Sequence, residues 1–169
     1  LGVQLAKAAG AEVTTTVSSK DKAHLARELG ADHIVLYPDQ PVEEYVQEYT
    51  NGEGFDLVFD TVGDANLQKS FAAMKLHGQV VSIAARSEQD LTPLHTRGGT
   101  LSVTFMLLPL ITGVGRKRHG EILEQLTCLV EEGKVRPLLD DSEFTISEVS
   151  QAHAKLESGK AVGKISLAW

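Results

Sequence analysis

The feature that most constrains the fold is a regular alternation of short β-rich runs with helical stretches. Residues 12–17 are rich in Val and Thr, and a helical stretch follows, which Ser18 and Ser19 can cap with their hydroxyls. An apolar run followed by a helical stretch recurs at residues 33–50 and again at residues 56–74. Strands that are apolar on both faces and alternate with helices form a parallel sheet that is covered on both sides. The pattern therefore predicts the α/β class and, with right-handed crossovers, a doubly wound parallel sheet.

The second half of the chain continues the alternation less regularly. We expect a turn at residues 77–78, where a histidine precedes a glycine, and strands at residues 79–84 and 101–105. The tail is expected to hold one more helix (147–157) and a last strand (164–168).

One long helix is predicted between Gly120 and Gly133, because apolar residues recur there at the spacing of one helix face. The residues of that face are Ile122, Leu123, Leu126, Leu129 and Val130. The single cysteine, Cys128, falls at a periodic position of this helix, so we expect it to be buried and inert. One isolated cysteine offers neither an internal disulfide nor a zinc site.

Charge and hydropathy exclude several classes of partner. A net charge of −7 argues against nucleic acid, and the one dense basic run, residues 116–119, is expected to be the solvated start of a helix. No stretch approaches the ~20 apolar residues that a membrane helix needs. Because the first residues also show no signal-peptide pattern, we expect no membrane contact and a cytoplasmic location.

Ligands of doubly wound sheets bind beyond the carboxyl ends of the strands, so the residues that follow each strand are the candidates. The strand at residues 12–17 runs into Ser18, Ser19 and Lys22, where an NAD-specific site usually has a carboxylate. Hydroxyl and ammonium groups beside a helix amino terminus suit a 2′-phosphate, although an ordinary helix cap with solvated lysines has the same sequence. Tyr37, after the next strand, is either a partner of adenosine or a half-buried surface residue.

Small residues mark three further candidate positions. Val62 and Gly63 follow one strand and Ala84 follows the next, which would let a ribose or a nicotinamide approach the backbone. Plain turn chemistry accounts for the same residues. Gly2, early in a helix, fits the third glycine of a Gly-x-Gly-x-x-Gly loop, which lets a helix pack closely on a sheet. The chain contains none of the familiar catalytic motifs, so no catalytic residue is assigned.

Six segments occur in the order and spacing of one known family: LGVQLAKAAGAEV (1–13), LGADHI (29–34), FDLVFDTVG (55–63), GQVVSI (78–83), GKVRP (133–137) and AHAKLESGKAVGKI (152–165). Together they cover essentially the whole chain. The chain resembles the medium-chain dehydrogenase/reductase superfamily, in its zinc-type alcohol dehydrogenase-like, quinone oxidoreductase (zeta-crystallin-like) branch. The resemblance implies a Rossmann-like fold and NADPH-dependent hydride transfer to a quinone, an enone or a related small carbonyl compound.

The resemblance also assigns cofactor-binding roles. It implies that Ser18, Ser19 and Lys22 hold the 2′-phosphate, and that Tyr37 lies beside the adenosine. The positions along the pyrophosphate, ribose and nicotinamide would be Gly2, Val62, Gly63, Ile83, Ala84, Thr104, Phe105 and Met106.

The resemblance further implies a domain organisation. Residues 1–134 would form the nucleotide-binding domain, without its first strand and most of its glycine loop, and residues 135–169 would return to an amino-terminal catalytic domain that we expect to be missing. Family members carry their zinc ligands in that domain or just before the glycine loop, so this sequence does not support zinc. Such a fragment should be inactive alone.

Unpaired strand edges promote pairing between chains, so we expect a homo-oligomer formed by strand exchange. Two alternatives to a free reductase stay open. One is the enoyl-reductase module of a larger synthase, and the other is a non-catalytic, crystallin-like binding or structural protein.

Overall fold

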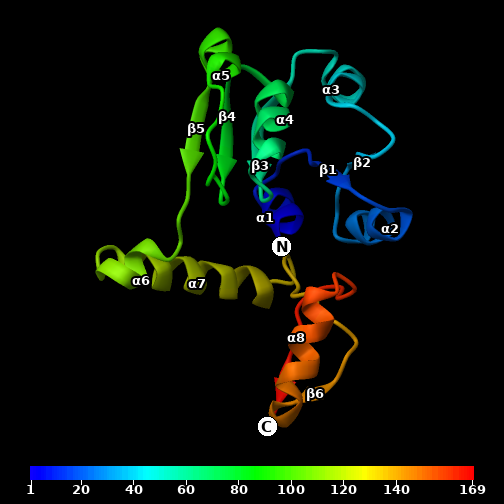
Figure 1. Cartoon of the computed structure of the whole chain (residues 1–169), viewed down its shortest axis with the longest axis vertical. Coiled ribbons are helices and arrows are strands. Elements are labelled where there is room, and N and C mark those ends of the chain that lie inside the picture. The colour runs from blue at the N-terminus through cyan, green and yellow to red at the C-terminus, as the bar shows by residue number, and fades with distance from the viewer.

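A computed structural model describes residues 1–169 as two small parallel sheets with flanking helices, followed by a long helix and a separate carboxyl-terminal unit (Figure 1). The elements in chain order are α1 (Gly2–Ala8), β1 (Thr14–Val17), α2 (Lys20–Glu28), β2 (His33–Leu36), α3 (Val42–Thr50), β3 (Phe55–Asp60), α4 (Ala65–Ala73), β4 (Met74–Ser82), α5 (Thr92–Arg97), β5 (Thr100–Val103), α6 (Leu108–Thr112), α7 (Arg116–Glu131), β6 (Phe144–Thr145), the 3-10 helix η1 (Ile146–Glu148), α8 (Val149–Glu157) and β7 (Leu167–Ala168). No helix combines the length and the apolar character that a bilayer span requires.

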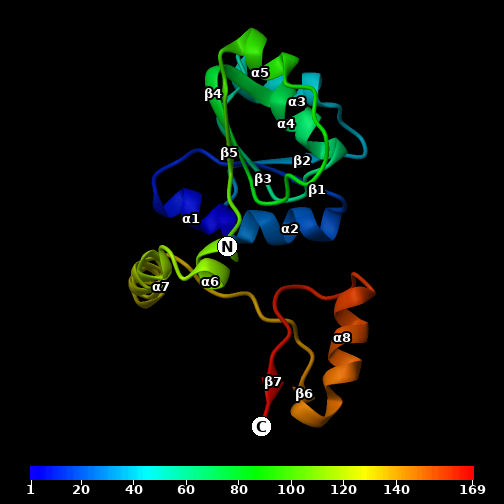
Figure 2. The same cartoon turned by 60° about the vertical axis from the view of Figure 1, so that its left-hand side comes forward.

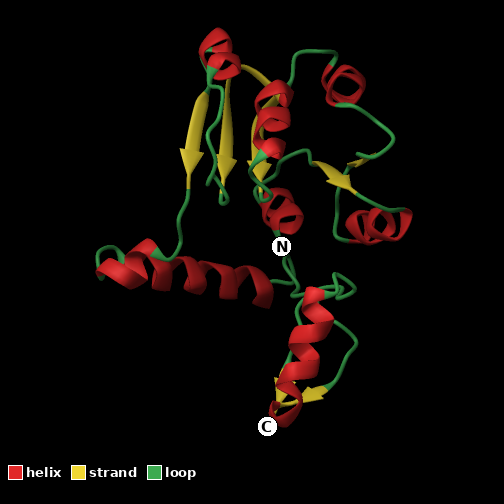
Figure 3. Cartoon of the chain, in the orientation of Figure 1, coloured by secondary structure: helices red, strands yellow, loops and turns green.

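Every strand pair is parallel, which confirms the predicted α/β class (Figure 3). β1 pairs with β2, whereas β3, β4 and β5 form a three-stranded sheet in that order, and β6 pairs with β7. The strands of the doubly wound part are thus divided between two sheets. β1 and β3 each have a strand partner on one side only, and this leaves one edge of each strand without a ladder.

The hydrophobic core lies around α4. One cluster lies between α4, β4 and α5 and consists of Leu67, Phe71, Met74, Val80 and Leu94. A second cluster lies between β2, α3 and the end of α4 and consists of Val35, Tyr45, Val46 and Ala73. Because α4 contributes to both clusters, this helix joins the two sheets.

β4 begins earlier than the sequence predicts. The expected turn at His77 and Gly78 lies inside the strand, and the chain passes from α4 to β4 at Met74 without a loop. Met74 pairs with Phe55, and the register then shifts between Phe55 and Leu57. His77 has a positive φ of 57°. The turn-forming pair therefore produces an irregularity within a strand, because pairing with β3 continues on both sides of it.

The helix α7 confirms the predicted helix but not its burial. It lies below the sheets and apart from them in both views, and it has no buried residue (Figures 1 and 2). The prediction that Cys128 is buried is wrong, since the residue is exposed. Within the predicted apolar face, Ile122 and Leu123 are exposed, and Leu126 and Leu129 are only partly buried.

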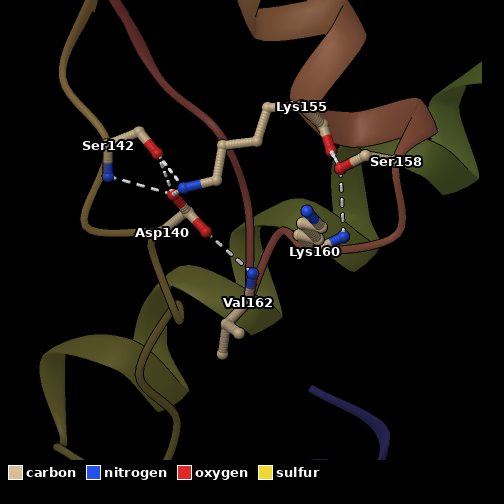
Figure 4. Close-up of polar contacts among 6 residues, drawn as sticks. All are labelled: Asp140, Ser142, Lys155, Ser158, Lys160 and Val162. Atoms are coloured by element: carbon tan, nitrogen blue, oxygen red, sulfur yellow. Dashed lines mark hydrogen bonds and ion pairs between the residues drawn. The ribbon is translucent and has the colours of Figure 1, made fainter.

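The carboxyl-terminal unit is held together by one buried carboxylate, Asp140 (Figure 4). Its Oδ1 accepts hydrogen bonds from the backbone N and the Oγ of Ser142 and from Nζ of Lys155 on α8. Its Oδ2 accepts from the backbone N of Val162 at 2.7 Å. One side chain thus connects the segment before β6, the helix α8 and the segment before β7.

This arrangement predicts acid lability of the carboxyl-terminal unit. Lys155, the Ser142 hydroxyl and the Val162 amide hold the pKa of Asp140 well below its usual 3.8. A carboxyl group whose pKa is lower in the folded state stabilises that state above its unfolded pKa, and the stabilisation is lost as the pH falls toward the folded pKa. The hydrogen-exchange protection of the Val162 amide should therefore fall steadily below about pH 4.

The variant Asp140→Asn is the control for this prediction. It should show low protection of the Val162 amide already near neutral pH and little further change with acid, because it has no carboxylate to titrate. A wild-type protection factor that stays constant below about pH 4 would contradict the assigned role of Asp140.

Candidate functional site

The first group of candidate residues lies at the carboxyl ends of β1 and β2. Ser19 caps α2, because its Oγ accepts a hydrogen bond from the backbone N of Lys22 at 3.3 Å. Nζ of Lys22 in turn donates to Oγ of Ser18 at 3.2 Å. Tyr37 follows β2, and its backbone N donates to the carbonyl oxygen of Val17 at 3.2 Å. The structure therefore gathers Ser18, Ser19 and Lys22 at one helix end, with Tyr37 after the adjacent strand.

The electrostatics of this group favour an anion. The first turn of α2 directs backbone N–H groups without helical partners toward the carboxyl end of β1, where the helix dipole is positive. Lys22 is exposed and adds a positive charge to the same turn. Asp21, in the same turn, opposes the effect. No carboxylate stands between Val17 and the helix, since both intervening residues are serines.

The second group lies at the carboxyl end of β3. Asp60, the last residue of the strand, is buried, and its Oδ1 accepts from the backbone N atoms of Val62 and Gly63, both at 2.8 Å. Its Oδ2 accepts from Oγ of Ser70 on α4 at 3.0 Å. Gly63 has a φ of 77°, and a Cβ there would lie 2.0 Å from the carbonyl oxygen of Ala84. Only glycine allows the two loops to approach this closely.

Buried Ser82 organises the neighbouring strand ends. Its Oγ accepts from the backbone N of Ala84 at 3.2 Å, and its carbonyl oxygen accepts from the backbone N of Thr104 at 2.9 Å. The backbone N of Ile83 donates to the carbonyl oxygen of Asp60 at 3.2 Å. Val62, Gly63, Ile83, Ala84 and Thr104 consequently share the carboxyl edge of the three-stranded sheet.

Three predicted residues lie at the margins of this edge. Phe105 and Met106 follow β5 on the way to α6 and are 51% and 63% exposed. Gly2 begins α1, where an added Cβ would lie 3.5 Å from Cε1 of Phe59, an ordinary contact distance. Packing of α1 on β3 therefore does not by itself require a glycine at position 2.

Sequence reasoning missed the residues that shape these loops. It assigned no functional role to Asp60, Ser70 or Ser82. The available signal was a polar residue at the end of each apolar run, since Asp60 and Ser82 are the last residues of β3 and β4.

Two other kinds of site were considered, a metal site and a depression on the opposite edge of the sheet. No group of three or more His, Cys, Asp or Glu side chains lies where it could hold a metal ion. An open depression of about 600 Å³ is lined by Gly52, Glu53, Lys75, Leu76 and Arg97. These residues lie at the amino ends of β3, β4 and β5, opposite the edge where parallel sheets bind ligands. The carboxyl edge remains the candidate site.

A family model described as zinc-binding dehydrogenase matches residues 29–167. The chain belongs to this family. It is thereby a member of the medium-chain dehydrogenase/reductase superfamily, as the six sequence segments predicted.

Two curated relatives are longer than this chain. It is 31% identical over 168 residues to a 2-haloacrylate reductase of Burkholderia sp, covering 98% of this chain and 50% of the reductase. It is 30% identical over 171 residues to a highly reducing polyketide synthase of Emericella nidulans, covering 98% of this chain and 7% of the synthase. The chain thus spans about half the length of the first relative and a small part of the second.

Solved structures confirm the fold. An alcohol dehydrogenase superfamily protein from Novosphingobium aromaticivorans matches with a TM-score of 0.90 and 35% identity, covering 98% of this chain and 51% of that one. A mycobacterial protein in complex with NADPH matches with a TM-score of 0.83 and 25% identity, covering 99% of this chain and 53% of that one. The predicted Rossmann-like α/β fold is confirmed by these matches.

Proposed function

We propose that the chain is the cofactor-binding part of an NADPH-dependent oxidoreductase that transfers hydride to a quinone, an enone or a related small carbonyl compound. The observation that carries the proposal is the contact between Lys22 and Ser18 at the amino end of α2. A cation and two hydroxyl groups stand where an NAD-specific site has a carboxylate, and they match an additional phosphate. The likeness to a protein bound to NADPH and to a reductase of a haloacrylate, an unsaturated acid, supports the same conclusion.

The proposed site extends over both sheets. Ser18, Ser19 and Lys22 would bind the 2′-phosphate and Tyr37 the adenosine. The close approach of Gly63 to Ala84, which only glycine permits, would place small residues beside the ribose. The residues along the pyrophosphate and nicotinamide would be Gly2, Val62, Ile83, Ala84, Thr104, Phe105 and Met106. The cofactor supplies the hydride when bound, and these residues bind and orient it.

In this proposal, substrate binding and catalysis require a second domain that is not part of these 169 residues. Residues 1–134 would be the nucleotide-binding domain, and residues 135–169 would return to a catalytic domain that shapes the substrate pocket. The double length of the reductase relative is consistent with this division. β1 and β3 each pair with a strand on one side only, and their free edges could pair with strands of a second copy to form a homo-oligomer.

The cofactor preference is tested at Lys22. Replacement by alanine should weaken NADPH binding by about 1–2 kcal/mol, the contribution of one charge-assisted contact, and leave NADH binding nearly unchanged. Isothermal titration calorimetry with both cofactors measures this directly. Lys117→Ala, which removes an equal charge from the exposed start of α7, should change neither affinity. Equal losses for NADPH and NADH in Lys22→Ala would refute the phosphate assignment.

A second candidate is the enoyl-reductase module of a larger synthase. The observation that favours it is the match to a polyketide synthase, of which this chain corresponds to 7%. The two candidates share the cofactor site and differ in the form of the substrate. Reduction of enoyl thioesters in preference to free enones by the full-length protein would favour the synthase module.

A further inference from the structure

Asp60 is a buried carboxylate without a cationic partner. The side chain belongs to a residue that is 2% exposed, and none of the ion pairs of the chain includes it. All three of its hydrogen-bond donors are neutral groups: the amides of Val62 and Gly63 and the hydroxyl of Ser70. Buried carboxylates are usually paired with a cation because desolvation of the charge is costly. Charge pairing therefore does not explain why the Asp60 carboxylate is buried at this position.

The contacts of Asp60 determine the path of the loop that follows β3. Two successive amides, those of Val62 and Gly63, donate to the same oxygen and close a tight turn immediately after the strand. This turn keeps Gly63 at a φ of 77° and in contact with the carbonyl group of Ala84. The carbonyl oxygen of Asp60 also accepts from the backbone N of Ile83. One residue thus connects the loops after two neighbouring strands.

Ser70 orients the carboxylate from the opposite side. Its Oγ lies 3.0 Å from Oδ2 of Asp60 and 3.3 Å from the carbonyl oxygen of Asn66. The single hydroxyl proton favours the shorter contact, and the carbonyl of Asn66 remains available as an alternative acceptor. Ser70 is buried in α4, the helix that contributes to both hydrophobic clusters, so its hydrogen bond to Asp60 fixes the position of the loop relative to this helix.

We propose that Asp60 is a positioning residue for the nicotinamide half of the cofactor. Its hydrogen-bonding geometry, rather than its charge, holds Val62 and Gly63 where the ribose lies in the proposed site. The inference rests on the proposed function and adds a specific role for a side chain that does not itself contact the cofactor.

Two substitutions separate geometry from charge. In Asp60→Asn, the amide oxygen can accept from Val62 and Gly63 while the amide nitrogen donates to Ser70, whose hydroxyl then donates to the carbonyl of Asn66. The pattern of contacts is kept and the charge is lost. In Asp60→Ala all three contacts are lost, so the loop is free to leave Ala84.

The experiment is a titration of the wild-type chain and both variants with NADPH and with adenosine 2′,5′-bisphosphate. The bisphosphate carries the adenosine and the 2′-phosphate but no nicotinamide half. Asp60→Ala should weaken NADPH binding about tenfold, as expected for lost buried hydrogen bonds, and leave bisphosphate binding unchanged. Asp60→Asn should bind both ligands within about threefold of wild type, since its contacts are kept.

The outcomes distinguish the inference from the proposed function. Unchanged NADPH affinity in Asp60→Ala would overturn the positioning role, and an equal loss in Asp60→Asn would show that charge is required and overturn it as well. Failure of the wild-type chain to bind either ligand would overturn the proposed function itself. Should Asp60→Ala not fold, Ser70→Ala provides the test, with an expected loss of about threefold for NADPH alone. Wild-type NADPH affinity in Ser70→Ala would then overturn the inference.

Discussion

Replacing Gly63 by alanine is expected to lower the free energy of unfolding by about 2–4 kcal/mol. Two effects add at this position. A Cβ atom would lie 2.0 Å from the carbonyl oxygen of Ala84 and 2.8 Å from its carbonyl carbon, so backbone must move. The φ of 77° is also unfavourable for a residue with a side chain. Urea unfolding of the variant and the wild type measures the difference.

The matched control for this prediction is Gly10→Ala. Gly10 has a φ of 81°, close to that of Gly63, but an added Cβ meets no atom within 4 Å. It should therefore lose only the conformational part, about 1 kcal/mol. If Gly63→Ala costs no more than Gly10→Ala, the close approach of the two strand-end loops is contradicted, and with it the placement of small residues beside the ribose.

Replacing Phe71 by alanine is expected to have the largest effect on stability, about 3–5 kcal/mol. Phe71 is fully buried in the cluster between α4, β4 and α5, and the substitution leaves a cavity that its neighbours cannot fill completely. Because α4 also contributes Ala73 to the second cluster, both sheets should lose stability together. A lower urea midpoint with one cooperative transition is the expected result.

Phe105→Ala serves as the control for the core substitution. Phe105 is about half exposed at the start of the segment that leads to α6, so its truncation should change stability by less than about 1 kcal/mol. Equal losses for the two phenylalanines would contradict the position of the core around α4.

The fold class was predictable because the strand and helix signals are local. The Val- and Thr-rich run before Ser18 became β1, and the serine-capped stretch after it became α2. The start of β4 was not predictable, since His77 and Gly78 carry the composition of a turn, whereas the pairing of Met74 with Phe55 involves residues 19 positions apart. Pairing across such a separation leaves no local pattern.

The exposure of α7 could not be predicted from the sequence for a related reason. Its apolar periodicity describes a face suited to packing and does not identify a partner. Cys128 lies on this helix, yet the chain places nothing against it, and the residue is exposed. Sequence periodicity alone therefore overestimates the core of the second half.

In the candidate site, too, contacts between sequence neighbours were predictable and contacts between distant elements were not. Ser18, Ser19 and Lys22 are neighbours in sequence, so their grouping was predictable from the helix start. The contacts of Asp60 with Ser70 and of Gly63 with Ala84 join different elements, and they became visible only in the folded chain. Sequence identified the residues along the edge and missed the side chains that hold the edge in place.

The most direct test of the proposed function is a comparison of NADPH and NADH binding to the chain by isothermal titration calorimetry. The two cofactors differ only in the 2′-phosphate, so the difference in affinity reports the interaction assigned to Ser18, Ser19 and Lys22. We predict tighter binding of NADPH by about tenfold, the effect of one or two charge-assisted contacts. Tighter binding of NADH, or no binding of either cofactor, would contradict the account.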